Sequence, residues 1–210
     1  MQKENRKYYE AYEDRYKTAH EKGVSWEQMK NTPIVMDIIN RYHLHPEQSL
    51  LEIGCGEGRD SATVLENGFH LMATDISPEA IDYCKKKKPD FESKFMVLDC
   101  LSSYLNEKFD FIYSIAVVHM FVLDEDRNGF YQFIRSHLKS DGIALICSMG
   151  DGNYEMLEPF QGFVEIQVDG SRIRVRIVGS DLFDKFTITW RPAVCNDDMV
   201  ERIALLTATC

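Results

Sequence analysis

"LLEIGCGEGRDSATVLENG", residues Leu50 to Gly68, is the stretch that decides the fold class. An apolar run is followed by Gly54, Gly56 and Gly58, and then by a helix-like pattern that ends at Gly68. Glycine lets a backbone turn tightly and approach a ligand with no side chain in between. A strand, a glycine-rich turn and a helix in this order predict a nucleotide-binding α/β domain.

The residues around this turn narrow the choice of nucleotide. The dinucleotide fingerprint requires a third glycine at position 59, which is Arg59 in this chain. Asp75 ends the next predicted strand, about 20 residues after Gly54, where a carboxylate binds ribose hydroxyls. Asp99 ends a third predicted strand and could accept a hydrogen bond from an adenine amine, or simply cap a helix. The two acids predict a nucleoside without choosing which one.

Short apolar runs alternate with helix-like segments in the central part of the chain. We expect strands at 49–54, 70–75, 95–99, 109–118 and 143–149, and helices at 59–68, 77–88 and 124–142. Runs that are apolar on both faces and alternate with helices predict a parallel sheet covered on each side. The predicted fold is therefore α/β and Rossmann-like, with the ligand beyond the carboxyl ends of the strands.

We expect one domain over residues 1–210, with different patterns at its two ends. Residues 1–45 read as a helical cap and residues 46–149 as the cofactor-binding core. Residues 150–210 contain a strictly alternating stretch around Asp169-Gly170, which predicts an antiparallel hairpin. A strand-like run at 185–190 follows, and then a last helix that begins at Asn196.

Composition excludes several classes of function. The chain has 210 residues and a net charge of −10, which argues against nucleic acid as a partner. Its one basic cluster, 85–88, ends a predicted helix, where lysines are favourable next to the helix dipole. The N-terminus is too polar for a signal peptide and no apolar run is long enough for a membrane span. We therefore expect a cytoplasmic monomer or homodimer with no membrane partner.

The six cysteines do not form a pattern typical of metal binding. They are scattered with no C-x-x-C pair, and the histidines form no H-E-x-x-H motif. This spacing predicts reduced thiols and no metal site.

The motifs taken together resemble a known family. "LLEIGCGEG", "ATDIS", "VLDC", "FDFIYSIAVVHMF" and "LKSDGIALI" are similar, in this order, to the motif series of class I S-adenosylmethionine-dependent methyltransferases. The resemblance covers about Ser49 to Ser148. "GCGEGRDS" and "SIAVVHMF" are most similar to small-molecule enzymes of the tellurite-resistance and thiopurine type.

The resemblance implies a role for each matching residue. The methionine part of the cofactor would contact Glu52, Gly54, Cys55 and Gly56, with Glu52 near its ammonium group. The adenosine would contact Asp75 and Ile76, and then Asp99 and Cys100. Two residues at the end of the fourth strand, Ser114 and Ile115, would present backbone to the methionine moiety and the transferred methyl.

Two further predictions concern residues outside these motifs. The aromatic N-terminal helix, with Tyr16, and Trp26 beyond it resemble the cap that covers the cofactor in this family. Electron-rich rings stabilise a nearby cation such as a sulfonium, although ordinary packing explains any single ring equally well. His119 follows the fourth strand, where a general base could deprotonate the acceptor, and it could equally pack or cap.

The C-terminal region departs from the family. The usual fold ends with a helix, a sixth strand and an antiparallel seventh, but little chain follows the helix predicted at Asn196. Either the strands within 163–190 substitute for that edge of the sheet, or they are an inserted cover over the substrate. We favour the inserted cover.

The predicted function is transfer of a methyl group from S-adenosylmethionine to a small-molecule acceptor, with S-adenosylhomocysteine as the product. One alternative is a degenerate methyltransferase fold that binds the cofactor as a sensor or scaffold without turnover. Another is a polyamine synthase that uses decarboxylated cofactor, but "SIAVVHMF" lacks the acids such enzymes need. Modification of protein or RNA fits poorly with an acidic chain.

Overall fold

The computed structural model describes residues 11–25, 32–121 and 123–147 with their side chains. It also describes the backbone of residues 148–150 and of the strands within 162–168, 171–177, 186–195 and 199–208.

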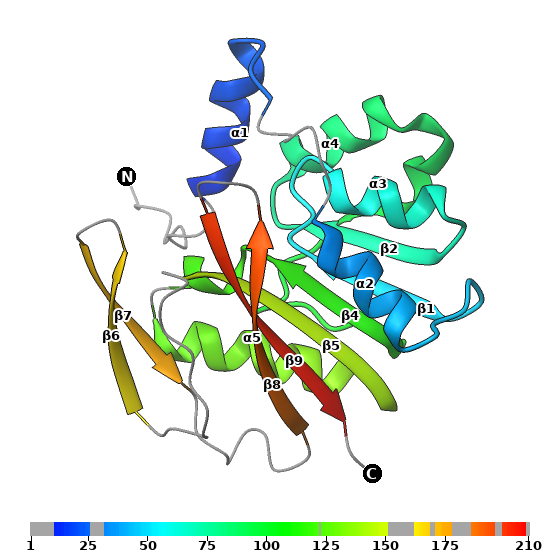
Figure 1. Cartoon of the computed structure of the whole chain (residues 1–210). Coiled ribbons are helices and arrows are strands. Elements are labelled where there is room, and N and C mark those ends of the chain that lie inside the picture. Colours follow the sequence, from blue (N-terminus) through cyan, green and yellow to red (C-terminus); the bar gives the residue numbers. More distant parts are fainter. Residues whose placement is uncertain are drawn as a thin grey trace.

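A seven-stranded sheet forms the centre of the molecule (Figure 1). Its first five strands are β1 (Ser49–Ile53), β2 (His70–Asp75), β3 (Phe95–Val97), β4 (Phe109–Ile115) and β5 (Leu138–Gly150). They are parallel and lie in the order β3-β2-β1-β4-β5. The order reverses between β1 and β4, which opens a crevice at the carboxyl ends of these strands. The predicted Rossmann-like fold is confirmed.

Helices connect and cover these strands. They are α1 (Ala11–Glu21), α2 (Pro33–Arg41), α3 (Arg59–Glu66), α4 (Pro78–Lys87) and α5 (Asp124–His137), with short 3-10 turns η2 (Pro89–Lys94) and η3 (Val118–Met120). The start of α4 follows its sequence signals, because the Ser77 hydroxyl accepts from the Ala80 amide and Pro78 takes the first position. Its lysines end the helix as predicted, and Lys88 pairs with Glu66 on α3.

Alternate residues of β1, β2, β4 and β5 enter two separate apolar cores. On β1, Leu50 packs with residues of α2, α3 and α4, whereas Leu51 packs with residues of α5. The same alternation divides Phe111 from Ile112 on β4. Strands that are apolar on both faces are therefore buried from both sides, which holds the strand ends in fixed positions.

The C-terminal part corrects the prediction of a last helix at Asn196. Residues Met199–Ala208 form strand β9, which pairs antiparallel with β5 on one side and with β8 (Phe186–Cys195) on the other. A helix-like local pattern is overridden here because two strand edges provide partners for the backbone along its whole length. The final sheet order, β3-β2-β1-β4-β5-β9-β8, therefore completes the edge that the sequence left in doubt.

The strands between 163 and 190 do not act as one unit. β8 joins the main sheet, which corrects the assignment of this segment to a cover. β6 (Gly162–Val168) and β7 (Ser171–Ile177) pair antiparallel in a sheet of their own. Figure 1 shows this pair in gold to one side of the main sheet. Its role as a cover stays a prediction.

Two boundaries differ from those expected. The helix predicted to reach Gly142 ends at His137, because the next residue, Leu138, has extended dihedral angles (φ −84°, ψ 137°) and starts β5. The strand predicted at 109–118 ends at Ile115, because Ala116 adopts a positive φ of 59° and turns the chain into η3.

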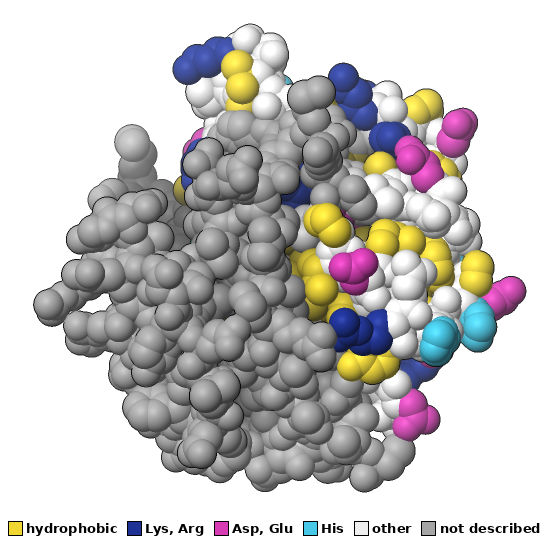
Figure 2. All heavy atoms as spheres, in the orientation of Figure 1, with side chains coloured by type: hydrophobic (Ala, Val, Ile, Leu, Met, Phe, Trp, Pro, Cys, Tyr) yellow, Lys and Arg dark blue, Asp and Glu magenta, His cyan; other side chains and the backbone are white. Residues whose placement is uncertain are grey.

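Figure 2 shows how charge is distributed over one face of the described surface. On the face that Figure 2 shows, acidic and basic side chains are scattered among polar and apolar ones. Among the described residues, every helix is too short or too polar to cross a lipid bilayer.

Candidate functional site

A cavity of about 380 Å³ lies at the carboxyl ends of the parallel strands, where the strand order reverses. Its wall is formed by segments that directly follow β1, β2, β3 and β4, and its roof by α1. Ten predicted residues line it: Tyr16, Glu52, Gly54, Cys55, Gly56, Asp75, Ile76, Asp99, Cys100 and Ile115. One fold feature, the topological switch point, thus brings together residues that are distant in the sequence.

The glycine loop after β1 approaches its neighbours too closely for side chains. The amides of Gly54 and Cys55 both donate to the carbonyl oxygen of Thr74, at 2.8 Å each. A Cβ on Gly54 would lie 2.2 Å from Cγ2 of Val117, and the φ of Gly54 is 79°. Gly56 has a φ of 54° and lies against the hydroxyl of Tyr16. The contact with Val117 requires glycine at position 54, and the positive φ favours glycine at both positions.

Asp75 joins the glycine loop to the start of α4. Its Oδ2 accepts from the Gly56 amide and its Oδ1 from the Ser77 amide, both at 2.9 Å. Burial raises the pKa of Asp75, although these backbone donors act in the opposite direction. Each carboxylate oxygen has a further lone pair, so the side chain can hold the loop and also accept from a ligand hydroxyl.

Glu52 is a buried acid at the end of β1. Its Oε2 accepts from the hydroxyls of Tyr113, at 3.0 Å, and Ser61. Burial, together with the nearby charge of Asp60, raises the pKa of Glu52 to about 8. A carboxylate in this environment gains from a cation brought into the cavity, because the cation compensates for the lost hydration.

Asp99 both lines the cavity and shapes the turn after β3. Its Oδ1 accepts from the Leu101 amide at 2.9 Å, and its Oδ2 accepts from the Ser102 hydroxyl at 2.7 Å. The two interpretations of Asp99, a turn cap and a ligand contact, are therefore compatible.

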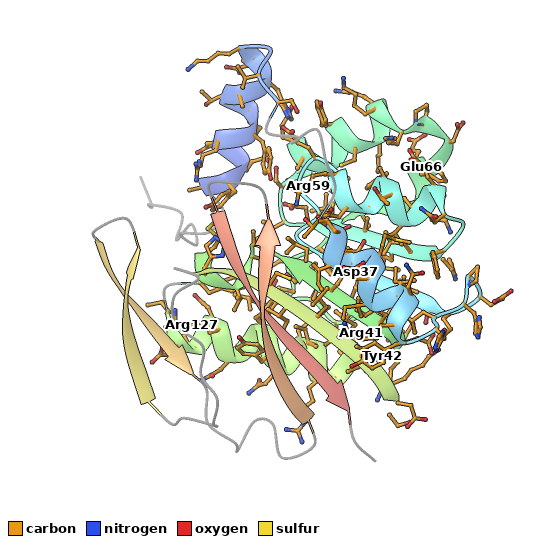
Figure 3. The ribbon with its side chains drawn as sticks, in the orientation of Figure 1. Asp37, Arg41, Tyr42, Arg59, Glu66 and Arg127 are labelled. Carbon is orange, nitrogen blue, oxygen red and sulfur yellow. The ribbon has the colours of Figure 1, made fainter. Side chains whose placement is uncertain are left out.

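Arg59 and Asp60 also line the cavity, and they belong to a polar network to which the sequence assigned no role. Arg59 begins α3 and donates from Nη2 to Asp60 Oδ2, at 2.9 Å, and to Thr32 Oγ1, at 2.6 Å. The amide of Thr32 donates to Asp60 Oδ1 at 2.5 Å, which ties the start of α2 to the start of α3. Figure 3 shows Arg59 beside the first turn of α2. In the sequence, the charged pair Arg59-Asp60 directly after the glycine loop was the one pattern that could have indicated this network.

Helix α1 and turn η3 both line the cavity and contact each other there. From α1 come Tyr12, Arg15 and Tyr16. The Tyr12 hydroxyl reaches Sδ of Met120 on η3 at 2.6 Å. Seven further lining residues lay outside the predicted set: Ile53, Glu57, Leu98, Ala116, Val117, Met120 and Phe121. Most come from turns, where no periodic pattern signals a role.

Two predicted residues, Ser114 and His119, do not line this cavity, and a third lies outside the described part of the chain. Ser114 is buried and its hydroxyl donates to the Ile53 carbonyl at 2.8 Å, so its side chain links β4 to β1. His119 on η3 is not among the lining residues, and burial lowers its pKa. Its two ring nitrogens have no hydrogen-bond partner within the described part of the chain. Trp26 lies outside the described residues. The roles of all three stay predictions.

Four of the six cysteines are described with their side chains. Cys55, Cys84, Cys100 and Cys147 are free and buried. The sequence did not indicate that Cys84 of α4 reaches the glycine loop, where its Sγ lies 3.3 Å from the Gly56 carbonyl oxygen.

Comparison with known proteins identifies the central region. Residues 51–146 match a family model described as a methyltransferase domain. The chain contains a methyltransferase domain. The match spans β1 to β5, and thus covers the wall of the cavity apart from α1.

Named relatives agree with this family. A malonyl-[acyl-carrier protein] O-methyltransferase of Acetivibrio thermocellus is 27% identical over 133 residues, which is 62% of this chain and 44% of the relative. A probable S-adenosyl-L-methionine-dependent methyltransferase, TehB, of Haemophilus influenzae is 25% identical over 56% of this chain and 41% of its own length. The matched region thus spans less than half of either relative.

The fold of the methyltransferase domain agrees with solved structures. The glycopeptide N-methyltransferase MtfA, in a complex with S-adenosylhomocysteine, superimposes with a TM-score of 0.58 at 18% identity. The superposition covers 84% of this chain and 90% of the other. The family match confirms the predicted resemblance to methyltransferases, and the solved structure confirms the predicted fold.

Proposed function

We propose that the protein transfers a methyl group from S-adenosylmethionine to a small-molecule acceptor and releases S-adenosylhomocysteine. The observation that supports this best is the cavity of about 380 Å³, with acids at Glu52, Asp75 and Asp99 along its wall. Its size is in the range of small-molecule sites.

The residues fit the chemistry of this cofactor. Glu52 would hold the ammonium group, because a cation beside it offsets the burial that raises its pKa to about 8. Asp75 would accept from the ribose hydroxyls and Asp99 from the adenine amine, with Ile76 against the base. The loop at Gly54 and Gly56 would lie against the methionine part. The bound cofactor supplies an activated methyl group.

The acceptor would enter from the side formed by α1 and η3. Tyr12, Met120 and Phe121 would exclude water there, and Arg15 would attract a negative charge. Because His119 does not line the cavity, an acceptor that arrives already ionised fits this wall best. A small anionic acceptor with a soft nucleophilic atom is therefore our preferred class.

Calorimetric titration with S-adenosylhomocysteine tests the cofactor, and NAD serves as the negative control. We expect binding to the parent protein and a loss of at least about tenfold in Asp75→Asn, because a charged acceptor is removed. Asp99→Asn provides a second site variant in case Asp75→Asn perturbs the loop. Asp82→Asn, at an exposed position of α4, should bind like the parent.

Methyl transfer from labelled cofactor to a panel of acceptors tests the reaction. The panel should include small carboxylates, thiols and a malonyl thioester, since one relative is named for a malonyl-carrier acceptor. Transfer to any small acceptor supports the proposal. Binding without transfer would favour the sensor alternative, and failure of a well-folded protein to bind would contradict the cofactor site. Cytoplasmic location and a monomeric or homodimeric state stay predictions.

A further inference from the structure

His20, near the end of α1, is held between two carboxylates from other parts of the fold. Its Nδ1 lies 2.7 Å from Oε1 of Glu79 on α4, and its Nε2 lies 2.9 Å from Oε1 of Glu57 in the glycine loop. Only 13% of the His20 side chain and 3% of the Glu57 side chain are exposed. A neutral imidazole has one N–H donor, so only the protonated ring can donate to both carboxylates.

Several other groups lie around the His20 ring. From α4, Tyr83 stacks on it with a centroid distance of 4.6 Å, and Lys87 is beyond, 5.4 Å from the centre of the Tyr83 ring. From α1, Tyr16 lies with its ring centroid 6.1 Å away. The Ser25 hydroxyl donates to the second oxygen of Glu57 at 2.5 Å. The two carboxylates are thus the charged groups nearest the ring.

The electrostatics agree with this geometry. Burial lowers the pKa of His20, but the hydrogen bonds and charges of Glu79 and Glu57 outweigh it and raise the pKa above its ordinary value. The stabilisation is therefore complete below the ordinary pKa of histidine, near ~6.5, and is lost as the pH rises through the raised pKa.

The same helix carries part of the roof of the cavity. One turn before His20, Tyr16 lines the cavity and its hydroxyl lies against Gly56, next to Glu57. At its other end, α1 is attached to α4, since Glu13 accepts from the Ser77 hydroxyl at 2.5 Å and from the Glu79 amide at 3.1 Å. The position of His20 thus determines how the Tyr16 side chain and the glycine loop sit together.

We propose that protonated His20 is a positioning residue for the cofactor: by bridging Glu57 and Glu79 it fixes α1 over the cavity and makes cofactor affinity depend on pH. This proposal rests on the proposed function, because it assumes that the cavity binds S-adenosylmethionine. Loss of the proton removes the hydrogen bond from the ring to one of the two carboxylates, and the attachment of α1 at this point weakens.

Titration with S-adenosylhomocysteine over a pH series tests the proposal in the parent and in His20→Gln. Glutamine keeps a neutral hydrogen-bonding side chain, so it imitates the deprotonated ring. We expect the variant to bind about fivefold more weakly than the parent near pH 6, the size expected for a partly exposed ion pair. Well above the raised pKa the two proteins should bind equally. The ratio of the Kd of His20→Gln to the Kd of the parent is taken at each pH. Glu52 titrates in both proteins, so its contribution to the pH dependence cancels in this ratio.

His45→Gln, at an exposed histidine before β1, is the matched control and should give a ratio of one throughout. A His20→Gln ratio that is constant with pH, or equal to one near ~pH 6, would overturn the proposal, because a purely structural role does not titrate.

A second measurement needs no ligand. In the ligand-free parent, the α1 amides should become less protected from hydrogen exchange as the pH rises through the raised pKa of His20, after correction for intrinsic exchange rates. His20→Gln should not show this step in protection. If the parent fails to bind S-adenosylhomocysteine at every pH while this step is present, the proposed function fails and the bridge stands. Absence of the step contradicts the bridge itself.

Discussion

At the scale of single residues, the site depends on backbone conformations that side chains would block. Gly54 combines a positive φ with close contact to Val117. Ala116, a non-glycine residue with a φ of 59°, turns the chain away from β4 and lines the same cavity. Such conformations cost energy and persist where the surrounding packing enforces them.

Gly54→Ala should disrupt the loop. The new methyl would lie 2.2 Å from Cγ2 of Val117, and L side chains are strained at a φ of 79°. We expect a loss of about 2–4 kcal/mol in the free energy of unfolding, from overpacking and strain together. Urea unfolding measures it, and S-adenosylhomocysteine titration reports the loss of the site.

Gly68→Ala separates the two causes. Gly68 also has a positive φ, of 85°, but a Cβ there would have nothing within 4 Å. We expect only the strain, about 1–2 kcal/mol, and unchanged affinity for the ligand. Equal losses in both variants would mean that the contact with Val117 is unimportant.

At the scale of elements, the start of α4 connects three parts of the site. Ser77 caps this helix through its hydroxyl, which accepts from the Ala80 amide at 3.1 Å. The same hydroxyl donates to Glu13 of α1, and the Ser77 amide donates to Asp75. One residue therefore holds the helix, its neighbour α1 and an acid of the cavity.

Ser77→Ala should destabilise the protein by about 1 kcal/mol through the lost cap, and more through the lost contact with α1. Chemical denaturation gives the total. Glu13→Gln keeps the cap, so its smaller loss isolates the contribution of α1. Ser93→Ala, at an exposed position on η2, should leave stability unchanged. A Ser77→Ala variant as stable as the parent would show that α4 needs no cap.

At the scale of the whole molecule, the acids of the cavity link stability to pH. The pKa of Glu52 is raised from 4.5 to about 8, chiefly by burial. A group with a raised pKa in the folded state stabilises the protein fully below its unfolded pKa. This stabilisation is lost as the pH rises through about 8.

The ligand-free protein should therefore unfold at a lower temperature at about pH 9 than at about pH 6, whereas Glu52→Gln should show a flatter profile. Calorimetry over the pH series measures both. S-adenosylhomocysteine at about 100 times its Kd should add about 2.7 kcal/mol at any pH where it binds. Parallel pH profiles for parent and variant would contradict a titrating Glu52.

How far the sequence predicted the structure depended on where the interacting partners lie in the chain. The loop at Gly54 and the cap at Ser77 were readable, because their partners are close in the sequence or are the backbone itself. Asp75 was placed correctly at the cavity, because parallel strands bring their carboxyl ends to one edge of the sheet. The helix predicted at Asn196 was wrong, because β9 takes its conformation from β5 and β8.

The sequence by itself determined the order of strands and helices from β1 to β5, the glycine loop and the resemblance to a family, since each is written in short-range patterns of residue type. Only the tertiary structure decided that β8 and β9 complete the sheet and that the Ser114 side chain links β4 to β1. It also brought His20 between Glu57 and Glu79. These contacts join residues far apart in the chain, and no local pattern specifies them because the packing of separate elements creates them.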